Sequence, residues 1–189
     1  VCPRAKGASR ETRPVSRFES GGWQSASMND ALKKAISRRV DRIRAGEDPQ
    51  CLGRLPSGWV ILAKFQPEPI VGGCMLLPDP AVPSLNALGA GDRARFLGDL
   101  ATVGDAVLKA TGAEHLNYLI LCNQVPELHG HCVPRFAGES PERRAMDPFE
   151  AYDFGTARVA DALGEDAGLA ARLRAALLEL GAAAPSATG

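Results

Sequence analysis

The sequence has no excess of charge of either sign, because 22 Lys and Arg side chains balance 22 Asp and Glu side chains. It therefore offers no overall attraction to nucleic acid or to an acidic membrane surface, and neither is expected as a partner. No run of about 18 apolar residues is present, and the arginine-containing start lacks the apolar centre of a secretory signal. We expect a cytoplasmic protein without a membrane segment.

Cys-x-x-Cys spacing is also missing, and the five cysteines are odd in number. Both features argue against a disulfide framework and against a structural zinc knuckle. We expect reduced thiols and no structural metal.

The distribution of apolar residues divides the chain into three regions. With 189 residues, 45% of them hydrophobic, the chain suffices for one globular domain with a core. Residues 1–26 have scarcely a large apolar side chain before Phe18, so we expect a disordered N-terminal extension. A basic arm that contacts nucleic acid is the alternative, although no aromatic residues are interleaved with its charges. We assign 27–150 to the folded domain and 151–189 to a C-terminal helical segment with a frayed tail.

Helical and extended patterns alternate along the domain. Helices are predicted where apolar residues recur every three to four positions, and strands where short runs of apolar or β-forming residues lie between Pro, Gly and turn residues. The predicted helices are 27–45, a second helix that Asp92 caps and Gly112 ends, and 156–180, which Gly164 and Gly168 interrupt. The predicted strands are 59–63 and 73–77, as an antiparallel pair, and 115–123 beside the histidine-containing stretch that ends at Phe136.

That last stretch, Pro126–Phe136, contains two of the only three histidines, His129 and His131, followed closely by Arg135. If the stretch is extended, alternate side chains project to the same face. One face would then carry Glu127, His129, His131 and Arg135, and the other Leu128, Gly130 and Cys132.

Three interpretations of the histidines remain open. They are polar residues on the hydrated face of a sheet, or they bind a metal, although only Glu127 is locally available as a further ligand because Cys132 faces away. In the third interpretation, one imidazole attacks a phosphorus atom. Arg135 would then offer a planar fork that suits phosphate, and the side-chain amides at the preceding turn could reach the same anion. These amides belong to Asn123 and Gln124.

The stretch resembles the signature of the histidine triad superfamily, His-x-His-x-His followed by two apolar residues and often Pro-Arg. When Pro134-Arg135 is aligned with that motif, its last two histidines fall on His129 and His131, and its first falls on Glu127. The order of strand, strand, helix, strand, strand from Gly58 to Phe136 also follows the family. The resemblance implies an α+β fold with an antiparallel sheet of about five strands, flanking helices and a C-terminal helical segment, commonly paired into a homodimer.

The resemblance also implies roles for these residues in a nucleotide-binding domain of the diadenosine polyphosphate hydrolase-like branch. His129 would be the nucleophile that forms a covalent nucleotidyl intermediate, and His131 would support it. Asn123 or Gln124 would contact the phosphate, and Arg135 would hold its charge. Glu127 would either repel an anion or orient His129.

The function implied is that of a nucleotide hydrolase or nucleotidyl transferase that cleaves at the α-phosphate of a dinucleoside polyphosphate or a related nucleotide. A nucleotide-binding or sensing module without turnover is the alternative. The expected partner is a small-molecule nucleotide. No cofactor is expected to be required, although Mg²⁺ could accompany the nucleotide.

Overall fold

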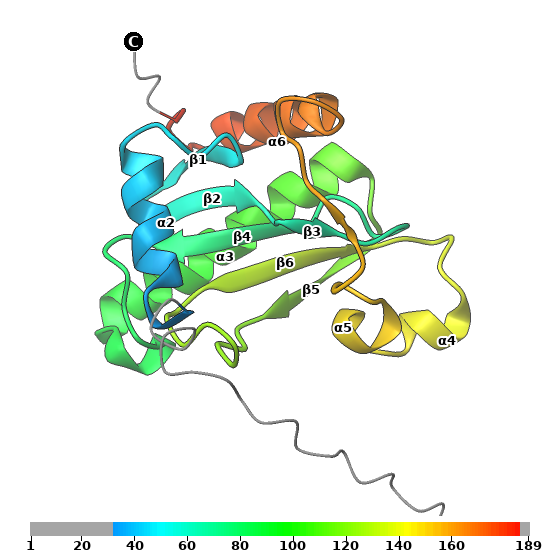
Figure 1. The fold of residues 1–189 in the computed structure, drawn as a ribbon, viewed down its shortest axis with the longest axis horizontal. Coiled ribbons are helices and arrows are strands. Elements are labelled where there is room, and N and C mark those ends of the chain that lie inside the picture. The colour runs from blue at the N-terminus through cyan, green and yellow to red at the C-terminus, as the bar shows by residue number, and fades with distance from the viewer. Residues whose placement is uncertain (1–31, 186–189) are drawn as a thin grey trace, which may run out of the picture.

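A five-stranded antiparallel sheet forms the centre of the computed structural model, which describes residues 32–185 (Figure 1). Its strands are β1 (Cys51–Leu55), β2 (Gly58–Leu62), β4 (Cys74–Pro78), β5 (His115–Leu119) and β6 (Gly130–Arg135). Two further short strands, β3 (Phe65–Gln66) and β7 (Arg158–Val159), pair with each other. The helices are α2 (Ala35–Arg44), the 3-10 helix η1 (Leu85–Ala87), α3 (Ala90–Thr111), α4 (Pro141–Arg144), α5 (Pro148–Ala151) and α6 (Ala167–Glu179). The predicted α+β fold is confirmed.

The strand order β1-β2-β4-β6-β5 places the histidine strand β6 inside the sheet, between β4 and β5. The predicted antiparallel pair is confirmed as β2 and β4, and the predicted neighbour of the histidine strand is β5. The edge strand β1 is not predicted by the sequence pattern, because Gly53 interrupts a short apolar run at the point where the register of β1 shifts.

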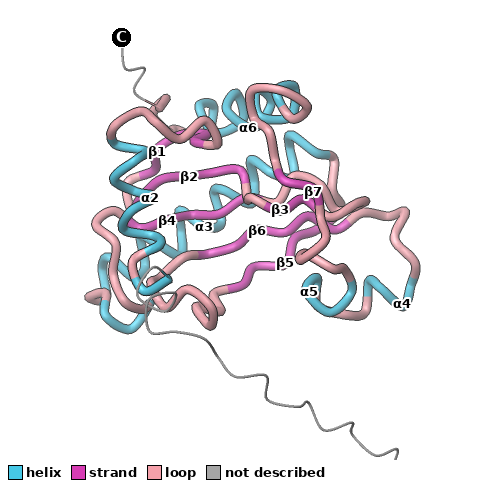
Figure 2. The backbone as a smooth tube through the Cα atoms, in the orientation of Figure 1, coloured by secondary structure: helices cyan, strands magenta, loops and turns pink. Residues whose placement is uncertain are grey.

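α3 and α6 cover one face of the sheet and enclose the largest hydrophobic core (Figure 2). α3 buries Phe96, Leu100, Val103 and Val107, which recur at the spacing of one helical face. α6 adds residues such as Leu173 to the same core. This face of the sheet is therefore filled by packing and leaves the opposite face for a site.

The ends of α3 show one confirmed and one wrong prediction. Gly112 follows the last turn with a φ of 71°, a left-handed conformation that glycine adopts without steric cost, and its N–H donates to the Leu108 carbonyl. The helix starts at Ala90, however, after Gly89 as its N-cap residue, so the prediction that Asp92 caps it is wrong. Asp92 therefore lies within the first turn, where its negative charge still favours the helix N-terminus.

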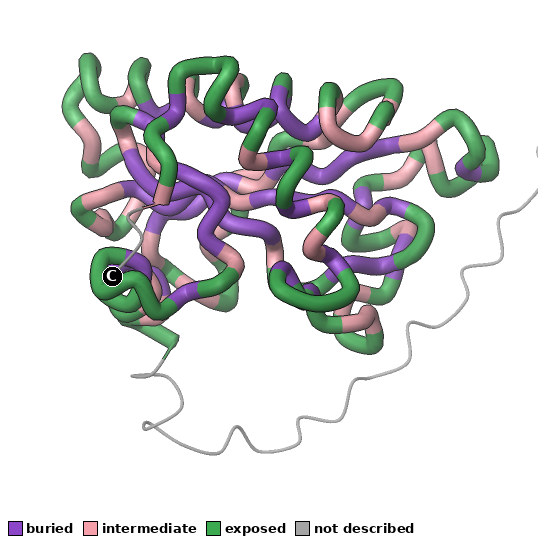
Figure 3. Tube along the Cα trace, turned by 90° about the horizontal axis from the view of Figure 1, so that it is seen from above, coloured by how far each residue is buried: buried purple, intermediate pink, exposed green. Residues whose placement is uncertain are grey.

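The opposite face of the sheet is shared by two covering elements that lie at different ends (Figure 1). α2 buries Ile36, Val40 and Ile43 in one cluster with residues of β2 and β4. At the other end, Tyr152 packs against Ile70 and Val133. The second cover comes from the segment 136–154, which includes α4 and α5. Figure 3 shows the buried stretches gathered between these outer, more exposed segments.

The C-terminal segment differs from the prediction in its helix and at the start of its tail. The predicted helix 156–180 is helical only in α6 (Ala167–Glu179), because the chain first forms β7 and a turn at Asp161 that Gly164 closes. The domain boundary at residue 150 stays a prediction, although α5 spans it and Leu173 of α6 lies in the same core as residues of the sheet. The predicted frayed tail is ordered at its start, since Ala183 pairs with Arg54 of β1.

The remaining predictions on the termini lie outside the described residues. They concern the N-terminal extension 1–26, the first turns of the helix predicted from Ser27, and the last four residues, 186–189. Within the described range, no helix combines the length and apolar character needed to cross a membrane.

Candidate functional site

The histidines lie at the beginning of β6, and only one of them belongs to the strand. β6 starts at Gly130, so Glu127 and His129 precede it in the loop that follows β5. Within the strand, His131 and Cys132 lie on opposite faces as predicted, with Cys132 buried in the core beside α3. Gly130 also faces α3, where a Cβ atom would come within 2.7 Å of the Leu100 side chain. This close approach explains the glycine between the two histidines.

His129 is held by a hydrogen bond to its own loop. Its Nδ1 lies 2.8 Å from the backbone carbonyl oxygen of Glu127, and the residue is 7% exposed. A carbonyl oxygen only accepts hydrogen bonds, so Nδ1 must carry the proton in this contact. In the neutral ring the lone pair then resides on Nε2, which is the nitrogen that can act as a nucleophile.

His131 lies against His129, with ring centroids 5.0 Å apart and planes inclined by 72°. Its register partners are Met75 on β4 and Leu119 on β5, both uncharged. Burial, and to a lesser extent the neighbouring His129, lowers the pKa of His131 to about 4. His131 is therefore a neutral ring at pH 7 and brings no positive charge to the site.

Glu127 does not direct its carboxylate at the histidines, which corrects the expectation that it repels an anion or orients His129 through its side chain. The carboxylate accepts hydrogen bonds from the backbone N–H groups of Ile36 and Ser37, at 2.8 and 3.1 Å, and from the Ser37 hydroxyl. The first turn of α2 has no acidic residue and no side-chain cap of its own. Glu127 therefore serves as the N-terminal cap of α2 from a distant loop, where the helix dipole also favours its charge.

Arg135 is the second correction. Arg135 is 1% exposed, and its guanidinium forms hydrogen bonds only to other groups of the described residues. Nε and Nη2 bind the Glu139 carboxylate, Nη1 donates to the Asn117 side chain and the Met146 carbonyl, and Nη2 also donates to the Arg143 carbonyl. All five N–H groups of a guanidinium are thereby used. In this conformation Arg135 has no donor left for a phosphate, although it lies on the same face of β6 as His131.

Glu139 receives this guanidinium in a buried position. Burial alone would raise the pKa of its carboxyl group, but hydrogen bonds from Arg135, the Phe136 N–H and the Tyr152 hydroxyl outweigh burial, so the pKa is lowered. The ionised pair therefore fastens the segment 136–154 to the end of β6.

Asn123 and Gln124 are exposed in the loop between β5 and β6. Among residues 32–185, no hydrogen bond connects either side chain to His129 or His131. Their predicted contact with a phosphate stays a prediction.

The sequence interpretation missed the aromatic residues that complete the site. Phe149 of α5 contacts His131 edge to face, with centroids 5.7 Å apart and an interplanar angle of 84°. Phe154 lies behind Phe149 at 4.5 Å. The only signal in the sequence is that Phe149 and Phe154 lie close together in a chain with 5% aromatic residues. This signal does not indicate which strand the two rings contact.

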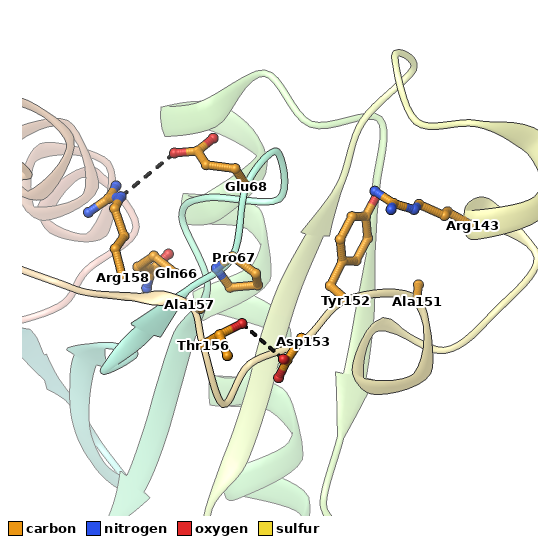
Figure 4. Close-up of a pocket in the computed structure, with 10 residues that line it drawn as sticks. All are labelled: Gln66, Pro67, Glu68, Arg143, Ala151, Tyr152, Asp153, Thr156, Ala157 and Arg158. Atoms are coloured by element: carbon orange, nitrogen blue, oxygen red, sulfur yellow. Dashed lines mark hydrogen bonds and ion pairs between the residues drawn. The ribbon is translucent and has the colours of Figure 1, made fainter.

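Two hollows on the surface lie away from the histidines. One, of about 400 Å³, is lined by residues of the β3 and β7 region and of the end of α5 (Figure 4). Arg158 in this lining is paired with Glu68 at 3.6 Å and also with Asp166, so the Arg158 guanidinium is already engaged by carboxylates. The other, of about 620 Å³, lies between the end of α2 and Arg174 of α6. Among residues 32–185, no three His, Cys, Asp or Glu side chains gather as a metal site.

Solved structures of histidine triad proteins resemble the chain in fold. A histidine triad protein from Sinorhizobium meliloti 1021 is 27% identical, with a TM-score of 0.53 over 65% of this chain and 85% of its own. One from Bradyrhizobium japonicum is 24% identical, with a TM-score of 0.55 over 71% of this chain and 94% of its own.

A third neighbour, a hypothetical histidine triad nucleotide-binding protein from Sulfolobus tokodaii, is 17% identical, with a TM-score of 0.55 over 79% of this chain and 93% of its own. No protein-family model matches the sequence, and no curated protein matches it significantly. The structural neighbours thus support the histidine triad superfamily, whereas the particular branch stays a prediction.

Proposed function

We propose that this protein cleaves nucleotides at the α-phosphate through a covalent intermediate on His129, as a hydrolase or a nucleotidyl transferase. The single observation that carries the proposal is the 2.8 Å contact between His129 Nδ1 and the Glu127 carbonyl, because it leaves the Nε2 lone pair free. The likeness to histidine triad structures supports nucleotides as the substrate class. Dinucleoside polyphosphates or nucleoside phosphoramidates are the substrates we favour.

In the first step, His129 Nε2 attacks the α-phosphorus, and the bond from phosphorus to the leaving group breaks as the P–N bond forms. Water or another acceptor then attacks the same phosphorus, gives up a proton, and releases His129. His131 is neutral at pH 7, so it contributes one N–H donor to a phosphate oxygen rather than a full positive charge. Asn123 and Gln124 are the loop residues proposed to add further donors.

A nucleotide-binding module without turnover is the second candidate, and the commitment of Arg135 to Glu139 favours it. An α-phosphate that carries negative charge in the transition state needs donors close by, and the expected guanidinium is not among them. Turnover therefore depends on the loop donors and on any Mg²⁺ that accompanies the nucleotide.

The two candidates are separated by turnover of a nucleotide panel. We expect release of mononucleotide by the wild-type protein and a loss of at least about 100-fold for His129→Ala, because the nucleophile is removed. His115→Ala is the matched control, since His115 is the third histidine and is exposed on β5. Equal inactivity of wild type and His129→Ala, with nucleotide still bound, would leave only the binding module.

We further propose a cytoplasmic homodimer whose only small-molecule partner is the nucleotide, with no nucleic-acid or membrane partner. No resident metal or cofactor is required in this proposal, and Mg²⁺ enters only with the substrate. The balanced charge of 22 basic and 22 acidic side chains supports the absence of a nucleic-acid partner.

A further inference from the structure

The two histidines differ in how their rings are held. His129 is fixed by its hydrogen bond to the Glu127 carbonyl. The His131 ring makes no hydrogen bond to any residue between 32 and 185, and its ring contacts are His129 at 5.0 Å and Phe149 at 5.7 Å. Its orientation therefore depends on apolar packing, to which Phe149 contributes from outside the sheet.

Phe149 is itself fixed by contacts that lie away from the histidines. Asp147 caps α5 by accepting hydrogen bonds from the N–H groups of Phe149 and Glu150, at 2.9 and 3.2 Å. Phe154 packs against the Phe149 ring at a centroid distance of 4.5 Å.

Tyr152, just after α5, donates its hydroxyl to Glu139, and Glu139 is paired with Arg135 on β6. The strand that carries His131 thus also anchors the helix that covers it. Such a closed set of contacts can hold one ring against another with little freedom.

We propose that Phe149 is a positioning residue, whose ring fixes the orientation of the His131 imidazole and shields it from water so that His131 stays neutral during the reaction. This inference rests on the proposed function, in which His131 supports His129. An oriented neutral imidazole presents its N–H in one direction. A freely rotating, hydrated imidazole would instead bind a proton more readily as the pH falls, which would place a positive charge beside the nucleophile.

The groups that face His131 are consistent with this role. Met75 on β4, Leu119 on β5 and Phe149 on α5 are uncharged, and among titratable groups only His129 acts on His131. The low pKa of His131, about 4, thus comes first from burial and only then from the charge of His129. Removing the ring that completes the burial should raise that pKa.

The test is a titration of the histidine ring protons by NMR in wild type, Phe149→Ala, Phe149→Leu and Phe149→Tyr, without nucleotide. Phe65→Ala is the matched control, because the exposed fractions of Phe65 and Phe149 are nearly equal, at 37% and 38%. Phe65 lies on β3, outside the five-stranded sheet that carries His131. We expect Phe149→Ala to raise the pKa of His131 by about 1 or more, since water reaches the ring. Phe149→Tyr and the control should leave that pKa unchanged.

The second measurement is the pH profile of kcat for the same variants. As the pH is lowered, kcat of Phe149→Ala should begin to fall at a higher pH than kcat of the wild type, because His131 is protonated earlier. KM should change less than about threefold. Phe149→Tyr should keep the pH profile of the wild type. Phe149→Leu, which keeps apolar bulk, should lie between them and serves if the alanine variant does not fold.

The proposal is overturned if folded Phe149→Ala or Phe149→Leu keeps the wild-type pKa of His131, or if that pKa moves while the kcat profile does not. If wild type turns over no nucleotide but the pKa still moves, the proposed function fails and the coupling between Phe149 and His131 stands. The titration needs no substrate, so the two failures are distinguishable.

Discussion

His129 and His131 are separated by a single glycine, yet different forces hold them. A hydrogen bond to a carbonyl sets the tautomer of His129, and packing against aromatic and apolar neighbours sets the state of His131. The residue that departs from the triad pattern, Glu127, contributes to the site through its main chain. Its side chain instead stabilises the start of α2.

Glu127→His would complete the triad pattern, but we expect no gain in turnover. The variant loses the acceptor for two N–H groups of α2, so the free energy of unfolding should fall by about 1–2 kcal/mol, as for lost helix caps. Urea unfolding followed by circular dichroism measures the loss, and turnover of the best nucleotide is measured beside it.

Ser37→Ala is the graded control for Glu127, because it removes only the hydroxyl that donates to the same carboxylate. It should cost about 0.5–1 kcal/mol. A Glu127→His variant that is as stable as wild type, or several-fold faster, would contradict the role in capping.

At the scale of elements, the two covers of the histidine face are attached by polar contacts of buried or partly buried side chains. The Glu127 carboxylate binds the start of α2, and it accepts from Ile36, which lies 91 positions earlier in the chain. The guanidinium of Arg135 on β6 binds the segment 136–154. Strand β6 and the loop that precedes it therefore join both covers to the sheet.

Arg135→Met should be strongly destabilising and should not act mainly on anion binding. It leaves the Glu139 carboxylate buried without its cation, which typically costs about 3–5 kcal/mol. The double variant Arg135→Met/Glu139→Leu should recover a large part of that loss, since no unpaired charge remains. Chemical unfolding of the three proteins gives the free energies of unfolding.

Arg95→Met is the matched control, because Arg95 forms an exposed pair with Asp92 within one helix. Its loss should stay below about 1 kcal/mol. If Arg135→Met unfolds like wild type while nucleotide binding weakens tenfold or more, Arg135 holds the anion after all.

The sheet could be predicted except for its edge strand β1, because its other strands show local signs. The apolar run at Trp59–Ala63 and the glycine that ends α3 both carry information within a few residues. The predicted face of the histidine stretch was right for His131 and Cys132, which are in the strand. It was wrong for Glu127, which lies before the strand, so the alternation of a strand does not apply to it.

The site as a whole could not be predicted, because its decisive contacts follow no local sequence pattern. Nothing near Arg135 indicates that a carboxylate four residues later will fold back and neutralise it. Nothing near His131 indicates that Phe149 will cover it. Such contacts depend on how the segment 136–154 packs, and that packing is a tertiary effect without a sequence period.

At the scale of the whole molecule, the central claim is that a nucleotide becomes bonded to His129. The most direct measurement is mass spectrometry of the protein mixed with a dinucleoside polyphosphate and denatured rapidly at alkaline pH, because phosphorus–imidazole bonds are labile in acid. We predict one nucleotidyl group on the peptide that contains His129, in wild type and in His115→Ala but not in His129→Ala. Mononucleotide release without this adduct, or an adduct on another residue, would contradict the account.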